Sequence, residues 1–154
     1  MRGIVVAVLF VAAATGLRAD PGAVATDEFD PAKLIGLDLK SAMSQLGVPQ
    51  SVYTYRGDEA GQDNVVFYYS DYLYLFWYQD RVWQVRCDRR FTHPLFGLAL
   101  GTPRDVVMRS FSRPLAARED SLYFDIDDSE FPLRVRLVFA DGVLSDVYVY
   151  RSDF

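Results

Sequence analysis

The stretch that most constrains the fold of this chain spans residues 64–88 and contains neither Gly nor Pro. It is dense in Phe, Tyr, Trp and Val. These residues suit a pleated sheet better than a helix, because a helical turn restricts the χ1 angles of branched and aromatic side chains. Polar breaks at 70–71 and 79–81 divide the stretch into three apolar runs. The pattern predicts an antiparallel meander with strands at 65–69, 72–78 and 82–87.

The composition is typical of a folded globular protein, since 51% of the 154 residues are hydrophobic and 15% are aromatic. The formal net charge of −5 argues against a nucleic-acid partner, which would require a basic face. The sequence holds one cysteine, Cys87, and one histidine, His93. No disulfide can therefore form within it, and the Cys/His cluster of a structural zinc site is missing.

The N-terminus has the pattern of a secretory signal peptide, with a basic start at residues 1–3 and an unbroken apolar run at 4–14. A helix over this run would rise only about 16 Å, roughly half the hydrocarbon core of a bilayer. A buried N-terminal helix is the alternative, but the run lacks polar positions at helical spacing. We predict that residues 1–19 are a signal peptide and that the protein is periplasmic or secreted. No cysteine near this site could carry a lipid anchor.

A six-residue motif occurs twice in the remaining chain. Residues 34–39 (LIGLDL) and 95–100 (LFGLAL) share four of six positions, 61 residues apart. Each copy precedes a short amphipathic helix, predicted at 39–46 and 103–111. The apolar stripe includes Ala42 and Met43 in the first helix, and Val107 and Met108 in the second. The pattern predicts a signal peptide at 1–19, a linker at 20–33, and two repeats at 34–92 and 93–154. Chance similarity between two small units is the alternative.

Further strands are predicted after each helix, at 52–56 in the first repeat and at 121–127, 133–139 and 143–150 in the second. Asp141 and Gly142 predict a type I′ hairpin turn, because both central residues of that turn require positive φ. The predicted fold class is α+β, a tandem repeat of a helix packed on a 3–4-stranded antiparallel β-meander. Two halves of about 60 residues should pack together, since neither buries a large core alone.

The pattern of Gly36, Met43, Leu46, Gly47 and Pro49, between a signal peptide and a β-meander, resembles the SmpA/OmlA family. That family includes the BamE subunit of the outer-membrane assembly machinery. Two such units in tandem resemble the β-lactamase inhibitory protein fold, in which paired repeats form one concave surface. The resemblance implies a protein-binding role in envelope assembly or as an inhibitor. The chain lacks the lipidated cysteine of BamE, and no binding residue of either family carries over.

Two residues could support an enzyme. His93, at the hinge between the repeats, is the sole candidate for the histidine of a catalytic triad, and a solvated linker histidine is the alternative. Cys87 could be a reactive thiol because Arg86, Arg89 and Arg90 lie nearby and could lower its pKa, and a buried inert cysteine is the alternative. We predict no catalytic residue. The runner-up is a small periplasmic enzyme or small-ligand binder with a cleft between the two halves.

The segment 125–130 holds four acidic residues, which could offer oxygen ligands to calcium. It lacks the glycine that allows an EF-hand loop to turn sharply. We interpret it as a solvated hairpin tip, and we predict neither a metal nor a cofactor for this chain.

Tyrosines form the candidate binding site. Tyr72, Tyr74 and Tyr78 would lie on one side of the predicted strand at 72–78, and Tyr148 with Tyr150 would form an equivalent row in the second repeat. Tyrosine combines a large contact area with a hydroxyl group, and it is enriched in binding hot spots. We predict that these five residues bind another protein. The alternative is that this face packs against the other half or is a solvent-exposed sheet surface without a binding role.

Overall fold

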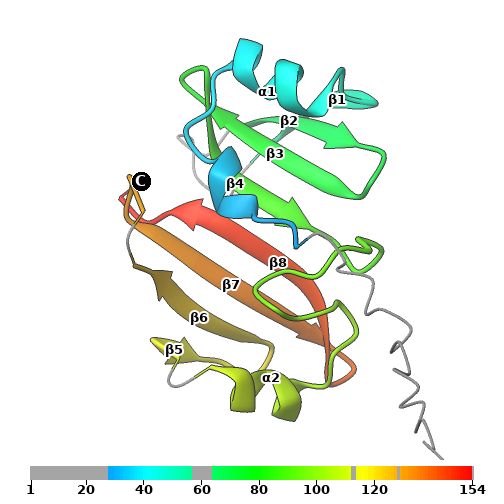
Figure 1. Ribbon diagram of the computed structural model, residues 1–154, viewed down its shortest axis with the longest axis vertical. Coiled ribbons are helices and arrows are strands. Elements are labelled where there is room, and N and C mark those ends of the chain that lie inside the picture. Colours follow the sequence, from blue (N-terminus) through cyan, green and yellow to red (C-terminus); the bar gives the residue numbers. More distant parts are fainter. Residues whose placement is uncertain (1–27, 57–63, 112–113, 128, 154) are drawn as a thin grey trace, which may run out of the picture.

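The computed structural model describes residues 28–56, 64–111, 114–127 and 129–153. The predicted signal peptide at 1–19 lies outside these residues, as does the predicted linker as far as residue 27. The elements in chain order are η1 (Pro31–Leu34), α1 (Leu39–Leu46), β1 (Ser51–Tyr55), β2 (Asn64–Tyr69), β3 (Leu73–Tyr78), β4 (Arg81–Cys87), α2 (Arg104–Ser110), β5 (Ala116–Ala117), β6 (Ser121–Ile126), β7 (Leu133–Ala140) and β8 (Val143–Arg151) (Figure 1). Neither described helix has the length and apolar character needed to cross a bilayer.

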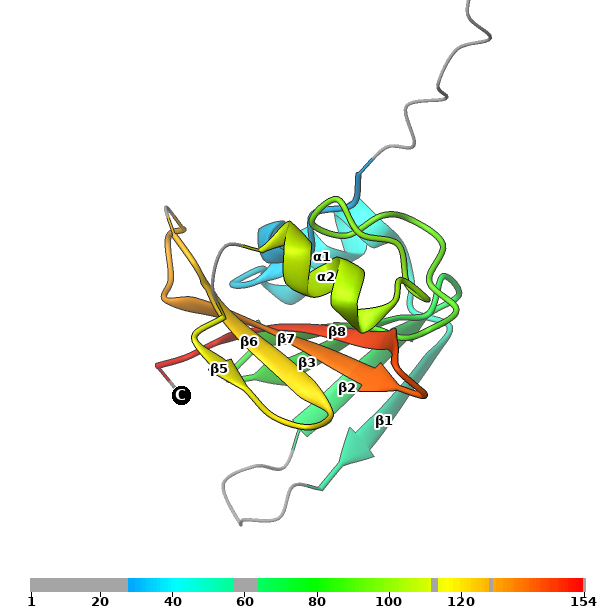
Figure 2. The ribbon, with the colours of Figure 1, turned by 90° about the horizontal axis from the view of Figure 1, so that it is seen from below.

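All eight strands belong to one antiparallel sheet with the order β1-β2-β3-β4-β8-β7-β6-β5. Both helices lie on the same side of this sheet (Figure 2). The predicted tandem repeat of a helix on a 3–4-stranded meander is therefore wrong. The reason is the pairing of β4 with β8, which joins Gln84–Cys87 to Val147–Tyr150. Without this pairing, β4 and β8 would each be an edge strand of a separate sheet. By pairing, each strand supplies hydrogen-bond partners for the backbone N–H and C=O groups of the other.

The main hydrophobic core is a cluster that extends across the β4–β8 junction, and two further buried hydrophobic residues, Val66 and Phe76, lie outside it on the opposite face of β2 and β3. It contains Leu75 and Val85 on one side of the junction and Leu137 on the other, all fully buried. In β7, buried residues alternate with partly exposed ones along the strand, which is the period of two expected for a sheet with one covered face. This alternation determines which side chains of β7 enter the core.

Two tight turns connect the central hairpins. Asp141 and Gly142 have φ values of 52° and 78°, so the predicted type I′ geometry of the β7–β8 turn is confirmed. The β3–β4 turn also has two residues with positive φ, Gln79 and Asp80. Tyr72 has a φ of 61°, which places it in the turn before β3 rather than in the strand predicted at 72–78.

The predicted burial of the two helix methionines is wrong. Met43 is 38% exposed and Met108 is 41% exposed. The preceding residues, Ala42 and Val107, are fully buried and belong to the core cluster. Each predicted stripe contained both neighbours, and only the earlier of the two faces the sheet, because adjacent positions lie about 100° apart around a helix axis.

The orientation of α2 predicts opposite results for two neighbouring residues. Val107→Ala should lower the free energy of unfolding by about 2 kcal/mol, because it leaves a cavity beneath the helix. Met108→Ala should change it by less than about 0.5 kcal/mol, since the side chain remains near water in the native state. Urea denaturation followed by circular dichroism measures both values. Equal destabilisation by the two substitutions would contradict the helix orientation.

Candidate interaction surface on the open face of the sheet

The sheet has a covered face, which packs under the two helices, and an opposite face, which we call the open face. None of the described helices lies on the open face (Figure 2). Side chains along a strand alternate between the two faces, and this alternation decides which side chains lie on the open face. In β7, Leu133, Val135 and Leu137 enter the core. Arg134 and Arg136, which alternate with them, therefore point to the open face.

Six residues from six adjacent strands form a line across the open face, which we call the Tyr–Arg row. The strand register places each member directly beside the next. In spatial order the row consists of Tyr68, Tyr74, Arg86, Tyr148, Arg136 and Tyr123. Directly opposed side chains on neighbouring strands are close enough to contact one another, so the row is a continuous surface.

The arginines of the row lie beside the rings of the tyrosines. The guanidinium of Arg86 is 5.1 Å from the ring centroid of Tyr74 and 5.6 Å from that of Tyr148. The guanidinium of Arg136 is 5.8 Å from the centroids of both Tyr148 and Tyr123. A cation–π contact contributes about 0.5–1 kcal/mol at an exposed site. These contacts restrain the long arginine side chains in the free protein.

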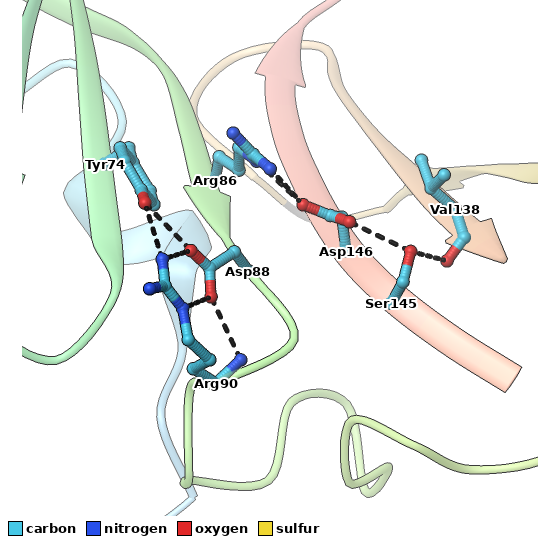
Figure 3. A network of polar contacts seen from close by, with 7 residues as sticks. All are labelled: Tyr74, Arg86, Asp88, Arg90, Val138, Ser145 and Asp146. Carbon is cyan, nitrogen blue, oxygen red and sulfur yellow. Dashed lines mark hydrogen bonds and ion pairs between the residues drawn. The ribbon is translucent and has the colours of Figure 1, made fainter. Parts of the chain in front are cut away.

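Arg86 is also fixed by an ion pair across the central junction. Its Nε atom donates to Oδ1 of Asp146 on β8 at 2.8 Å (Figure 3). The hydroxyl oxygen of Ser145 lies 2.9 Å from Asp146 Oδ2 and 3.2 Å from the carbonyl oxygen of Val138. The charge of Arg86 is thus balanced within the protein.

Arg136 is less well paired than Arg86. Its ion pair with Asp120 is long, with 4.0 Å between Nη2 and Oδ2. Its Nε atom is buried and has no hydrogen-bond partner among the described residues. The side chain is nevertheless 38% exposed. The terminal nitrogens of this guanidinium can therefore receive a carboxylate from outside.

A second polar cluster fixes Tyr74 and its neighbours (Figure 3). The Tyr74 hydroxyl donates to Asp88 Oδ2 at 2.8 Å, and Arg90 donates to the same carboxylate from Nη2 at 2.6 Å and from Nε at 3.1 Å. Burial and the hydrogen bond to Asp88 raise the pKa of Tyr74 to about 12. Burial alone would raise the pKa of Asp88, but the bonds from Arg90 and Tyr74 outweigh it and lower that pKa to about 2. The tyrosine is therefore neutral and the aspartate charged near neutral pH.

The five tyrosines predicted as a binding site occupy different places. Tyr74 and Tyr148 belong to the Tyr–Arg row. Tyr72 lies in the turn before β3 with its ring 4.1 Å from the Arg90 guanidinium. Tyr78 ends β3 beyond a register shift, and Tyr150 lies in the next line of the sheet, opposite Gln84 and Arg134. The five do not form one patch, and their role in binding stays a prediction.

Four members of the row were not identified from the sequence: Tyr68, Arg86, Arg136 and Tyr123. The alternation of arginine with aliphatic residues at 133–137 was a usable signal, because it places both arginines on one face. The row could also have been predicted from the cross-strand register, but the register can be assigned only when the order of strands in the sheet is known. That order is not contained in any single stretch of the sequence.

The residues considered for catalysis do not form a recognisable site. Cys87 is fully buried, and burial raises the pKa of its thiol, so the thiol is protonated at neutral pH. His93 is exposed and its ring lies 5.5 Å from that of Phe91. Neither residue lines the cavity of about 670 Å³ that lies on the covered side, between η1 and the connection from β6 to β7. The predicted enzyme alternative, with a cleft near these residues, stays a prediction.

The acidic segment at 125–130 is partly engaged within the protein. Asp125 accepts a hydrogen bond from Nε of Arg134 at 2.9 Å. Within the described ranges, which omit residue 128, no three His, Cys, Asp or Glu side chains are grouped to hold a metal ion.

Comparisons with known proteins bear on the fold. No protein-family model matches the chain, and no curated protein matches its sequence. The crystal structure of an extracellular protein containing a SCP domain, from Bacillus anthracis str. Ames, aligns with 88% of this chain at a TM-score of 0.51 and 17% identity. This chain covers 49% of that structure, about half its length. At this level of identity, the likeness concerns the fold alone.

The resemblance to the SmpA/OmlA family and to the β-lactamase inhibitory protein fold is corrected by these results. The chain forms one eight-stranded sheet rather than separate helix-on-meander units, and the structural neighbour is an SCP-domain protein. The literal matches behind the resemblance were small and apolar residues at turns and on one helix face. Such residues meet local requirements that many small folds share.

Proposed function

We propose that this chain is an exported protein that binds another protein through the open face of its sheet. The observation that carries the proposal is the Tyr–Arg row, a line of aromatic and cationic side chains that no described helix covers. The signal-peptide pattern at 1–19 supports export. The structural neighbour is an extracellular protein, which is compatible with export of this chain.

The row has the chemistry of a binding hot spot. Tyrosine and arginine are over-represented among residues whose truncation weakens protein–protein complexes most. Tyr74 is already restrained by Asp88, and Arg86 by Asp146, in the free protein. Less side-chain entropy is then lost on binding, which favours affinity.

The expected partner presents a carboxylate to Arg136. The ion pair of this guanidinium with Asp120 is long. The ring of Tyr123, beside Arg136, has its centroid 5.4 Å from the guanidinium of Arg118. Two cations therefore lie around one ring, and Arg136 is only weakly compensated by Asp120, on a chain that is acidic as a whole. An acidic side chain of the partner would complete the hydrogen bonding of Arg136 and would be steered toward it.

Site-specific photo-crosslinking in the native organism tests this proposal. A photoreactive amino acid in place of Tyr123 should capture a protein, and the same group in place of Val106, an exposed residue of α2 on the covered side, should not. Arg136→Gln should lower the crosslinked yield by roughly 10-fold or more, because hot-spot truncations cost about 2 kcal/mol. Arg109→Gln, an exposed arginine of α2, is the matched control and should leave the yield unchanged.

Equal capture from both positions, or capture that is insensitive to Arg136→Gln in a folded variant, would overturn the proposal. Mass spectrometry of the captured protein then separates a role in envelope assembly from a role as an inhibitor.

A further inference from the structure

The two edges of the sheet differ in how they are protected. At one edge, β5 contains only two residues, Ala116 and Ala117. At the other edge, β1 contains five residues, all of them exposed. β1 pairs only with β2 in the described structure, so its outer side offers backbone N–H and C=O groups to another strand (Figure 1). Natural edge strands are usually shortened or protected by charged residues, proline or bulges.

Strand β1 has none of these protections within its length. Its sequence, Ser-Val-Tyr-Thr-Tyr, contains neither a charged residue nor proline, and its pairing with β2 runs without a bulge. Apolar exposure is high at the same edge, with Val52 55% exposed and Val48, just before the strand, 83% exposed. Val65 on β2, the pairing partner of Thr54, is also exposed. The edge therefore combines unpaired backbone groups with apolar side chains.

We propose that β1 pairs antiparallel with β1 of a second copy of this chain, about a two-fold axis through Tyr53. The pairing joins the two eight-stranded sheets into one continuous sheet. Val52 then lies opposite Thr54 of the other copy, Ser51 lies opposite Tyr55, and Tyr53 lies opposite its own equivalent. Among registers with such an axis, this one pairs all five residues of the strand.

A second copy suits this edge for two reasons. Pairs of β-branched residues and pairs of aromatic residues are favourable across strands, and the proposed register creates both kinds. In addition, the chain is acidic as a whole but the strand carries no charge, so two copies meet here without like charges in opposition.

The geometry also leaves the Tyr–Arg row free. Val52 pairs with Phe67, which packs against the core cluster, so Val52 and Thr54 point to the covered face. An axis perpendicular to the sheet keeps the open faces of both copies on the same side. The inference thus goes beyond the proposed function and does not depend on it.

Sedimentation equilibrium at up to about 100 μM tests the pairing, a range chosen because small interfaces bind weakly. The wild-type protein should show twice the mass of one chain. Val52→Lys with Thr54→Lys should be monomeric, because the register places lysines opposite lysines. Val52→Glu with Thr54→Glu should also be monomeric, because the register then places glutamates opposite glutamates. An equal mixture of the two variants should regain the doubled mass, because lysines of one then face glutamates of the other.

The matched control is Leu115→Lys with Val143→Lys, which places two lysines at exposed apolar positions away from β1 and should remain dimeric. Circular dichroism confirms that each variant is folded. A monomeric wild type, dimeric single-sign variants, or a mixture that does not associate would each overturn the proposal.

Discussion

Leu75→Ala should lower the free energy of unfolding by about 3 kcal/mol, within a single cooperative transition. Leu75 is fully buried in β3 and belongs to the core cluster that crosses the β4–β8 junction. Its truncation leaves a cavity that neighbouring strands can only partly fill, because protein interiors are close-packed. Since both parts of the sheet share this core, the whole protein should unfold at a lower urea concentration.

The same effect should appear when the truncation is made on the other side of the junction. Leu137→Ala removes a fully buried side chain from β7. Both tryptophans, Trp77 and Trp83, lie in β3 and β4, so tryptophan fluorescence reports on the part of the sheet that does not contain Leu137. In a protein with one core, the fluorescence transition of Leu137→Ala should shift as far as the transition measured by circular dichroism.

The control for both truncations is Leu115→Ala, which changes the same side chain at a position that is 56% exposed. It should alter the free energy of unfolding by less than about 0.5 kcal/mol. A fluorescence midpoint that stays at the wild-type value in Leu137→Ala would show that the two parts unfold independently, against the single core described above.

Asp88→Asn should destabilise the protein by about 2 kcal/mol at pH 7, and the deficit should shrink in acid. The carboxylate is only 7% exposed and accepts bonds from Arg90 and Tyr74, so its pKa falls from an ordinary value of 3.8 to about 2. A group whose pKa is lower in the folded state contributes its full stabilisation above the unfolded value. That stabilisation is lost as the pH falls from about 4 toward 2.

Urea denaturation of Asp88→Asn and the wild type at pH 7, 4 and 2.5 measures this difference. The gap in free energy should be constant above pH 5 and should narrow below pH 4. Asp105→Asn serves as the control, because Asp105 also has a lowered pKa from its arginine partner but lies exposed on α2. Asp105→Asn should not show the same pH-dependent difference in free energy of unfolding from the wild type, since solvent screens the exposed ion pair of Asp105 with Arg109. A gap for Asp88→Asn that persists unchanged to pH 2.5 would contradict the described role.

The location of the sheet elements could be predicted from the sequence because their causes are local. The strand predicted at 133–139 corresponds to β7, which spans Leu133–Ala140. The Asp141–Gly142 pair predicted its turn, because only a few residues tolerate positive φ. The helix at 39–46 was likewise located by its apolar spacing and by the glycine that ends it.

The order of strands and the content of the open face could not be predicted in this way. The pairing of β4 with β8 uses backbone hydrogen bonds between residues about sixty positions apart, and backbone groups are the same in every residue. The Tyr–Arg row depends on that pairing, because Arg86 meets Tyr148 only across this junction. Packing likewise decided which of two neighbouring stripe residues faces the sheet, since Val107 is buried and Met108 is exposed.

The sequence by itself determined the approximate positions of both α-helices and of the strands other than β5, since turn chemistry, side-chain type and helix ends act over a few residues. Only the tertiary structure decided that the strands form one sheet, that Tyr74 and Tyr148 lie on the two sides of Arg86, and that β1 is left at an edge. These are relations between distant segments. They depend on which backbone groups find partners and which side chains fill the shared core, and that choice is made by the folded chain as a whole.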